Sequence, residues 1–524
     1  MKSTYKILIP LLFVLTATVS CSKSYLDRPS LSAITSDNFY QTTSDLRLAT
    51  AGLYGGAVWF DWNYFPYLGM GDILSGNLLQ PYNADLVQFT SFSITGDNSQ
   101  LANTWRAFYK IVAQCNVTIN AIKAKAPASI PAKDVNAALA EARFIRATAY
   151  FHLVQLWGAV PIIEDNTKLI DSSLLYRNNV ADVYKFIATD LTFASQNLPA
   201  SDAAGRVTTW SAQGMLSKVY LTWAGLNQNM TRDQALLDSA KLYAGNVCNK
   251  SGLSLLPSYY NLFRTQYNDN PEVLFALQWA PGLGYGYGNA LQAQFAPSGD
   301  LVTGGGGWGG AIGPTYDLYT LYTQQDSIRR KASFMLTGDF YPELNAAGGG
   351  YKSTGCNLKK HIVGTAADNN SPTMDLWSST EHNAILRLAD VYLVYAEAIL
   401  GNNASTTDPE AMKFFNKVRT RAGVDPAPLI TADTLFRERR IELAYESQFW
   451  FDLVRLSYYN PQKAIASINN QKRELFTYSN GVATPTPYSV AITPATVNTF
   501  TLPLPSTELT ADPKLSQPPV AYYK

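Results

Sequence analysis

Residues 141–163 read EARFIRATAYFHLVQLWGAVPII, and this stretch predicts a long, deeply packed helix. Five small or apolar residues recur at three- and four-residue steps, which places them on one helical face: Ala142, Ile145, Ala149, Leu153 and Leu156. Gly158 and Pro161 then mark the end of the helix. Small residues on the packed face let a neighbouring helix approach closely, so we expect stacked helical hairpins.

A related triplet recurs further along the chain, each time late in an apolar-periodic segment: Ala149-Tyr150-Phe151, Val219-Tyr220-Leu221 and Val391-Tyr392-Leu393. Helix pairs that repeat small and large residues in this way are typical of tetratricopeptide-like arrays. The alternative is that three unrelated core helices share a common triplet. The pattern favours the array.

The composition indicates a folded protein with a nearly neutral surface. Of 524 residues, 47% are hydrophobic and only 15% are charged, which excludes a disordered chain. The formal net charge of +1 gives no electrostatic footprint for nucleic acid. The chain is rich in Tyr (32) and Trp (10), side chains that stack on sugar faces and anchor interfaces.

The N-terminus predicts secretion and lipid anchoring. Lys2 and Lys6 precede a short apolar run over residues 7–19, and Cys21 follows small residues at the place where a signal peptide is cut. This arrangement is similar to a bacterial lipobox, although an ordinary secretory signal with an incidental Cys21 is the alternative. We expect a signal peptide over 1–20, lipidation of Cys21 and a tether over 21–30. No run is long enough to span a bilayer, which needs about 20 apolar residues.

The remaining cysteines and the histidines show no ligand spacing and no disulfide framework: Cys115, Cys248, Cys356, His152, His361 and His382. We predict no metal site. The charged cluster at 437–442 has the i,i+4 spacing of a salt-bridge face, either solvated or between helices, and not that of a phosphate site.

Periodicity along the chain predicts helices, one strand over 272–279 and an irregular Pro/Thr-rich tail from 461 onward. The predicted helices cover residues 31–60, 101–125, 183–197, 209–224, 233–248, 314–325, 384–400, 409–422, 434–446 and 450–456. Between them, an aromatic loop occupies 58–77 and a Gly-, Tyr- and Pro-rich region follows the strand. Long loop-rich insertions in a helical scaffold are typical of binding surfaces.

Several segments together resemble the SusD/RagB family of Bacteroidetes outer-membrane lipoproteins. They begin with Cys21 and YLDRP (25–29) and continue with the 141–161 segment, GRVTTWSAQGMLSKVYLTWAG (205–225), LRLADVYLVYAEA (386–398), FNKVRTRAGV (415–424), RERRIELAYESQFWFDLVRL (437–456) and LPLP (502–505). Three features depart from the family pattern. Ser447 and Phe449 stand where Gly and Arg are usual, and the tail SQPPVAYY lacks the customary Asn-Pro-Gly-Tyr ending.

The resemblance implies a mainly α fold: four tetratricopeptide-like helical-hairpin units plus a loop-rich lobe with a few short strands. We expect one domain over 31–524, with the helical scaffold at about 31–270 and 380–460, the ligand-facing lobe at about 271–380 and the tail at about 461–524. Family members cap a SusC-like TonB-dependent transporter at the cell surface and help to capture glycans. They are binding proteins, so the resemblance implies no enzyme activity.

Sugar capture needs flat aromatic faces flanked by hydrogen-bonding groups. The candidates are aromatic residues outside periodic helices, with the nearest polar residues beside them: Trp308, Tyr285, Tyr287, Trp62, Trp59, Tyr64, Asp72, Asn83 and Asn289. For Trp308, which lies in a run of glycines, packing within the loop is the alternative to ligand contact. Tyr285 and Tyr287 point to the same side if their stretch is extended.

Other functions remain as alternatives. The glycine runs lack the spacing of a dinucleotide fingerprint and the Lys-Ser/Thr of a P-loop. A glycoside hydrolase needs two positioned carboxylates, and no local signature points to such a pair. Peptide uptake, as in a minority branch of the family, and a transporter lid with no ligand of its own also stay open. We expect no cofactor, and the sequence leaves open whether the lobe holds a structural Ca²⁺.

Overall fold

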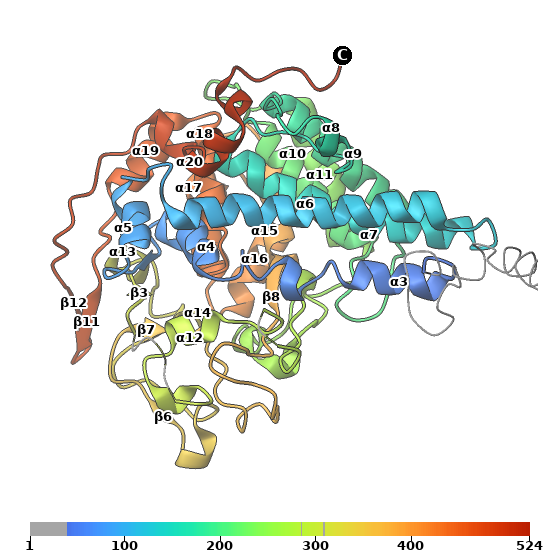
Figure 1. The fold of residues 1–524 in the computed structure, drawn as a ribbon. Helices are drawn as coiled ribbons and strands as arrows, with labels where there is room; N and C mark the ends of the chain where they lie inside the picture. Colours follow the sequence, from blue (N-terminus) through green and yellow to red (C-terminus); the bar gives the residue numbers. More distant parts are fainter. Residues whose placement is uncertain (1–38, 285, 306, 308–309) are drawn as a thin grey trace, which may run out of the picture.

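The computed structural model describes residues 39–524 except 285, 306, 308 and 309 (Figure 1). Cys21, Tyr285 and Trp308 therefore lie outside the described residues, as do the expected signal peptide and tether. Helices dominate the described part, and the strands form only short antiparallel pairs. This confirms the predicted mainly α fold.

The scaffold is a succession of helices that pack against their neighbours along the chain. In its first half these are α6 (Ser99–Lys125), α7 (Ala132–Trp157), α9 (Val180–Asn197), α10 (Thr209–Trp223) and α11 (Gln234–Lys250). After the lobe, α15 (Leu388–Leu400) packs against α11 and is followed by α16 (Pro409–Arg421), α17 (Ala432–Glu442) and α18 (Phe449–Ser457). Figure 1 shows α6 and α7 crossing the molecule above the lobe.

Helix α7 occupies the interior, as its sequence predicts. The five residues of the predicted face, Ala142 to Leu156, all have fully buried side chains. Trp157 is 2% exposed, packs edge-to-face on Trp105 and donates its indole N–H to the Pro503 carbonyl at 3.0 Å. Gly158 ends the helix with φ +67°, a conformation that L side chains rarely adopt. The three helices that carry the recurring triplet, α7, α10 and α15, lie in one core because α10 contacts both others.

The lobe between the two halves of the scaffold contains short elements. Its helices are α12 (Leu291–Phe295), α13 (Tyr316–Tyr319) and α14 (Ser327–Ser333). Four antiparallel pairs cross it: β1 (Leu78–Leu79) with β3 (Gly313–Pro314), β2 (Val273–Leu277) with β8 (Asn383–Arg387), β4 (Phe334–Met335) with β7 (Asn357–Leu358), and β5 (Phe340–Tyr341) with β6 (Tyr351–Lys352). Strand β2 confirms the predicted strand, and its pairing with β8 closes the lobe at its base.

Several segments differ from the sequence expectation, among them the helix expected over 314–325, of which only α13 forms. In the expected helix over 31–60, the structure describes helix α3 (Thr43–Ala51) and the single turn η1 (Gly56–Val58). The aromatic loop at 58–77 is partly helical, with α4 (Phe65–Tyr67) and the π-helix η2 (Leu68–Ile73). Two further short helices were not expected, the partly buried α5 (Ala84–Ser91) and the surface helix α8 (Lys168–Asp171). Residues 384–387 belong to strand β8 and not to the following helix.

The tail, predicted to be irregular, begins with a helix. It contains α19 (Pro461–Asn469), the hairpin β11 (Phe476–Ser479) with β12 (Val482–Pro485), and α20 (Ser506–Ala511). Pro461 takes the first helical position, where its missing N–H costs nothing, so a proline that suggested irregular chain in fact starts a helix. Figure 1 shows the hairpin standing at one edge of the molecule.

The charged cluster on α17 forms buried ion pairs between helices. Arg439 is 1% exposed and contacts Asp390 of α15 at 2.7 Å and Asp452 of α18 at 2.9 Å. The predicted salt-bridge face is therefore interhelical and not solvated.

Within the described residues no helix is long and apolar enough to cross a membrane. Cys115, Cys248 and Cys356 have free thiols.

Candidate functional site

Four aromatic residues from three separate segments form a partly exposed surface that we call the aromatic ledge: Phe60, Tyr64, Tyr287 and Trp377. The rings of Phe60 and Tyr64 stack with centroids 6.4 Å apart and planes 15° apart. Trp377 meets Tyr64 edge-on at 6.1 Å. Tyr287 is 39% exposed, and Tyr64 and Trp377 are half-buried, so three of the four rings reach solvent.

Glycines bring the Tyr287 loop onto the 59–64 segment. A Cβ at Gly56 would lie 3.0 Å from Cδ1 of Tyr287, and one at Gly286 would lie 3.6 Å from Cγ of Phe60. Gly286 has φ +89°, a conformation that favours glycine over any residue with a side chain. The Ala280 N–H donates to the Tyr287 carbonyl at 2.8 Å and closes the base of this loop.

A buried polar brace holds the three segments of the ledge together. The Asn63 side-chain amide donates to Oδ1 of Asn289 at 3.1 Å. The backbone of Asn289 exchanges two hydrogen bonds with Ser379, at 2.8 and 3.0 Å, so it fixes the Trp377 segment as well. The Asn289 amide also donates to the Glu381 carbonyl at 2.9 Å and to Oδ1 of Asn383 at 2.9 Å.

The brace continues into a buried ion pair. His361 Nδ1 lies 3.0 Å from Glu381, and its Nε2 lies 2.8 Å from the Tyr445 carbonyl. Burial alone would lower the pKa of His361, but the charge of Glu381 and these hydrogen bonds raise it above its ordinary value. Both ring nitrogens of His361 contact oxygen atoms, so the imidazole joins the brace to the Tyr445 segment.

Polar groups flank the exposed rings. The Asp375 carboxylate accepts a hydrogen bond from the backbone N–H of Trp377 at 2.9 Å, and Asp375 is exposed. Asp61, next to Phe60, is also exposed and pairs with Lys110 at 3.0 Å. Gln294 donates to the Tyr64 hydroxyl at 3.1 Å and orients that ring. Flat aromatic faces beside carboxylates suit a sugar, whose C–H face stacks while its hydroxyls donate.

Two of the predicted aromatic residues do not reach the ledge surface. Trp59 and Trp62 are fully buried. Trp59 donates its indole N–H to the Leu53 carbonyl at 2.8 Å, and Trp62 packs against Phe108 with centroids 4.8 Å apart. These indoles extend the hydrophobic core under the ledge, so we correct their assignment from ligand contact to support.

The three predicted polar partners are structural as well. Asp72 is fully buried and accepts hydrogen bonds from Asn77 Nδ2, Tyr445 N and Ser447 N at 2.9–3.1 Å. Burial raises the pKa of Asp72 in spite of these bonds. Asn83 caps α5 by accepting from the Leu86 N–H at 3.1 Å. Asn289, 1% exposed, is the brace described above.

Tyr64 and Tyr287 are the predicted residues that the structure places on the ledge. Phe60, Trp377 and Asp375 were missed by the sequence reasoning. Trp377 had a usable signal, because it lies in SPTMDLWSST (371–380), a segment without helical periodicity. This is the criterion that selected Trp308. Among the described residues there is no cluster of three or more His, Cys, Asp or Glu side chains that could hold a metal ion.

Comparisons with known proteins agree with this architecture. Residues 337–523 match the model of the SusD family, and residues 71–221 match a family described as starch-binding associating with outer membrane. A SusD-like protein of Bacteroides ovatus is 39% identical over 457 residues, which cover 87% of this chain and 83% of that protein. SusD-like protein P2 of Formosa agariphila is 27% identical over 86% of this chain and 90% of its own length.

Solved structures give the same result. A crystal structure with a xylogluco-oligosaccharide has a TM-score of 0.85 and 35% sequence identity, and the match covers 91% of this chain and 99% of that one. A SusD superfamily protein from Parabacteroides distasonis, 20% identical, shares the fold with a TM-score of 0.69 over 92% of this chain and 99% of that one.

Proposed function

This chain belongs to the SusD family, and from that premise we propose that it is an outer-membrane lipoprotein that captures a glycan on the aromatic ledge. Lipidated Cys21 anchors the chain, and the binding domain faces the outside of the cell. The bound glycan passes to a SusC-like TonB-dependent transporter. SusD-like proteins bind and do not catalyse, so the proposal includes neither an enzymatic activity nor a cofactor.

The observation that carries the proposal is the arrangement of the ledge. Tyr287 is exposed and Trp377 is half-buried, Tyr64 lies between Phe60 and Trp377, and the Asp375 carboxylate accepts from the Trp377 backbone. Tyr285 and Trp308, outside the described residues, stay predicted ligand-contacting residues. Exposed aromatic clusters on soluble domains mark interaction sites, because burying their faces on a ligand recovers hydrophobic free energy.

The relative with a bound xylogluco-oligosaccharide supports a neutral glycan as the ligand class. The chain itself has a formal net charge of +1, which becomes −1 if Lys2 and Lys6 are removed with the signal peptide. A near-neutral protein gives no long-range attraction for a polyanion. The lipid anchor keeps the ledge close to the transporter, so a modest intrinsic affinity is sufficient for uptake.

Native affinity electrophoresis tests the proposal. The chain from Ser22 onward is run through gels that contain xyloglucan, mannan, arabinan, xylan or laminarin, beside a protein of similar size that binds no glycan. We expect one polymer to retard migration, and we expect the Tyr287→Ala/Trp377→Ala double variant to lose that retardation.

Three results would contradict the proposal. Unchanged migration through every polymer, followed by binding to a peptide library, would assign the chain to peptide uptake. Unchanged migration without peptide binding would favour a transporter lid with no ligand of its own. Retardation that survives the double variant would place the glycan site away from the ledge.

A further inference from the structure

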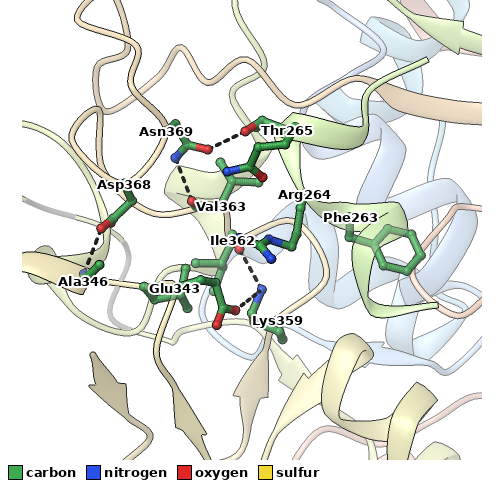
Figure 2. Close-up of a pocket in the computed structure, with 12 residues that line it drawn as sticks. Phe263, Arg264, Thr265, Glu343, Ala346, Lys359, Ile362, Val363, Asp368 and Asn369 are labelled. Atoms are coloured by element: carbon green, nitrogen blue, oxygen red, sulfur yellow. Dashed lines mark hydrogen bonds and ion pairs between the residues drawn. The ribbon is translucent and has the colours of Figure 1, made fainter. Parts of the chain in front are cut away.

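Two adjoining hollows in the lobe are lined in part by the same residues, Arg264 and Glu343. The larger is an open groove of about 730 Å³, within the range of about 300–1,000 Å³ typical of small-molecule sites. The smaller, of about 190 Å³, is the recess shown in Figure 2. We call the larger one the basic groove; it is lined by Tyr260, Arg264, Ser327, Ile328, Arg330, Lys331, Phe340, Pro342 and Glu343. No ledge residue lines either hollow.

Apolar side chains form one wall of the basic groove. Ile328 on α14 and Phe340 on β5 are 43% and 46% exposed, so both side chains offer apolar surface to the groove. The Phe340 ring lies against Gly350, where a Cβ would come within 2.6 Å of its Cζ. This contact with backbone holds the ring in place, so the groove presents a fixed aromatic face.

The charges in the groove do not balance. Arg330 pairs with Asp339, and Glu343 accepts a hydrogen bond from Tyr260 and lies 3.6 Å from Lys359. Arg264 and Lys331 have no carboxylate or hydrogen-bond acceptor for their side chains among the described residues; Figure 2 draws no interaction from the Arg264 guanidinium. Lys331 Nζ lies 5.4 Å from the centroid of the Tyr341 ring. Two positive charges are left over in a chain whose overall charge is nearly zero.

We propose that the basic groove is a second carbohydrate site, which binds a sugar that carries an anionic group. Arg264 and Lys331 hold the carboxylate of a uronic acid or a sulfate ester, and the sugar ring packs on Phe340. A guanidinium matches the planar geometry of a carboxylate with two parallel N–H donors, and an ammonium adds a point charge. This goes beyond the ledge, which offers aromatic faces and carboxylates and so selects neutral sugars.

Calorimetric titration with defined oligosaccharides tests the second site. The probes are tri-galacturonate, its methyl ester as the neutral counterpart, and a sulfated carrageenan tetrasaccharide. We expect saturable binding of at least one acidic probe and none of the methyl ester. The carboxylate and sulfate probes show which anion the groove takes. Raising the salt concentration from about 50 to about 300 mM should weaken binding, because exposed charges are screened.

Matched variants locate the site. Lys331→Gln and Arg264→Gln should each weaken binding of the acidic probe by about tenfold or more. Lys331→Arg keeps the positive charge and should retain most of the affinity for the acidic probe. Lys241→Gln removes an equal charge from an exposed position on α11 and should change nothing. Within the part of the chain that the structure describes, neither the Arg264 nor the Lys331 side chain makes an ion pair that the fold could lose, so both variants are expected to fold.

The inference is overturned if neither acidic oligosaccharide binds, or if both groove variants bind the acidic oligosaccharide as tightly as the parent chain does. It is also overturned if the chain binds vesicles of anionic lipid but neither acidic oligosaccharide. Its failure is distinguishable from failure of the ledge proposal. Lys331→Gln should keep retardation by a neutral polysaccharide, whereas Trp377→Ala should lose that retardation and keep binding of the acidic probe.

Discussion

Asn63 donates its side-chain amide to the Oδ1 of Asn289 at 3.1 Å, and through this bond the aromatic segment before α4 is joined to the Tyr287 loop 226 positions further along the chain. Both side chains are buried, with exposures of 0% and 1%. The ledge is therefore assembled by an interior hydrogen bond between segments that are remote in sequence. Its rings are positioned before any ligand arrives, which lowers the entropy cost of binding.

A double-mutant cycle measures this bond. Asn63→Ala and Asn289→Ala should each lower the free energy of unfolding by about 1–3 kcal/mol, since each leaves a buried polar partner unsatisfied. The double variant should lose less than the sum, with a coupling of about 0.5–1.5 kcal/mol. Urea unfolding of the four proteins provides the values. Strict additivity would show that the two side chains do not act together.

Trp377→Ala should weaken glycan binding by about tenfold or more, as truncation of a central aromatic contact does. Trp210, half-buried at the start of α10, provides the control, because Trp210→Ala removes the same side chain from the scaffold. Affinity electrophoresis in a series of polymer concentrations gives the relative affinities. Equal losses in the two variants would indicate general destabilisation and not a ledge contact.

Ser447→Gly should stabilise the fold. Ser447 is buried with φ +55°, in the left-handed region that favours glycine, and its hydroxyl has no partner among the described residues. Relief of the backbone strain, about 1–2 kcal/mol, exceeds the entropy cost of a glycine, about 0.5–1 kcal/mol. We expect a gain of about 1 kcal/mol in the free energy of unfolding. A loss would mean that the hydroxyl stabilises this turn.

The stability of the fold should depend on the protonation of His152. Burial lowers its pKa to about 4. The imidazole of the unfolded chain titrates near its ordinary pKa of about 6.5, so the unfolded chain binds this proton first as the pH falls. His152 contributes on the order of 3 kcal/mol to the free energy of unfolding. This contribution is complete above about pH 6.5 and is lost as the pH falls from there to about 4.

His152→Phe isolates that effect. The phenyl ring can keep the stacking on Phe108, whose centroid lies 5.0 Å from that of the imidazole, but it cannot titrate. The free energy of unfolding of this variant should change less than that of the parent chain between about pH 7 and about pH 5. Parallel pH profiles for the two proteins would assign the acid sensitivity to other groups.

Local periodicity was sufficient to predict the scaffold. The spacing in residues 141–157 predicts both the helix and its buried face, because helical neighbours are fixed by three- and four-residue steps. The same reasoning was insufficient for the ledge. Trp59 and Trp62 lie in a non-periodic loop and yet are buried, because the loop is covered by segments that no local pattern predicts.

The polar candidates show the same limit. Asp72 accepts a hydrogen bond from Ser447, and Asn289 accepts one from Asn63. Both partners are remote in sequence, so the structural role of Asp72 and Asn289 is visible only in the folded chain. Ser447, in contrast, was identified from the sequence as standing where glycine is usual. Its left-handed φ is the physical reason for that preference.

A structure of the chain with the oligosaccharide selected by affinity electrophoresis tests the central claim most directly. The account predicts a sugar ring stacked on Tyr287 or Trp377, with a hydroxyl donating to the Asp375 carboxylate. A sugar bound elsewhere on the molecule, with both aromatic side chains still exposed to solvent, would contradict it.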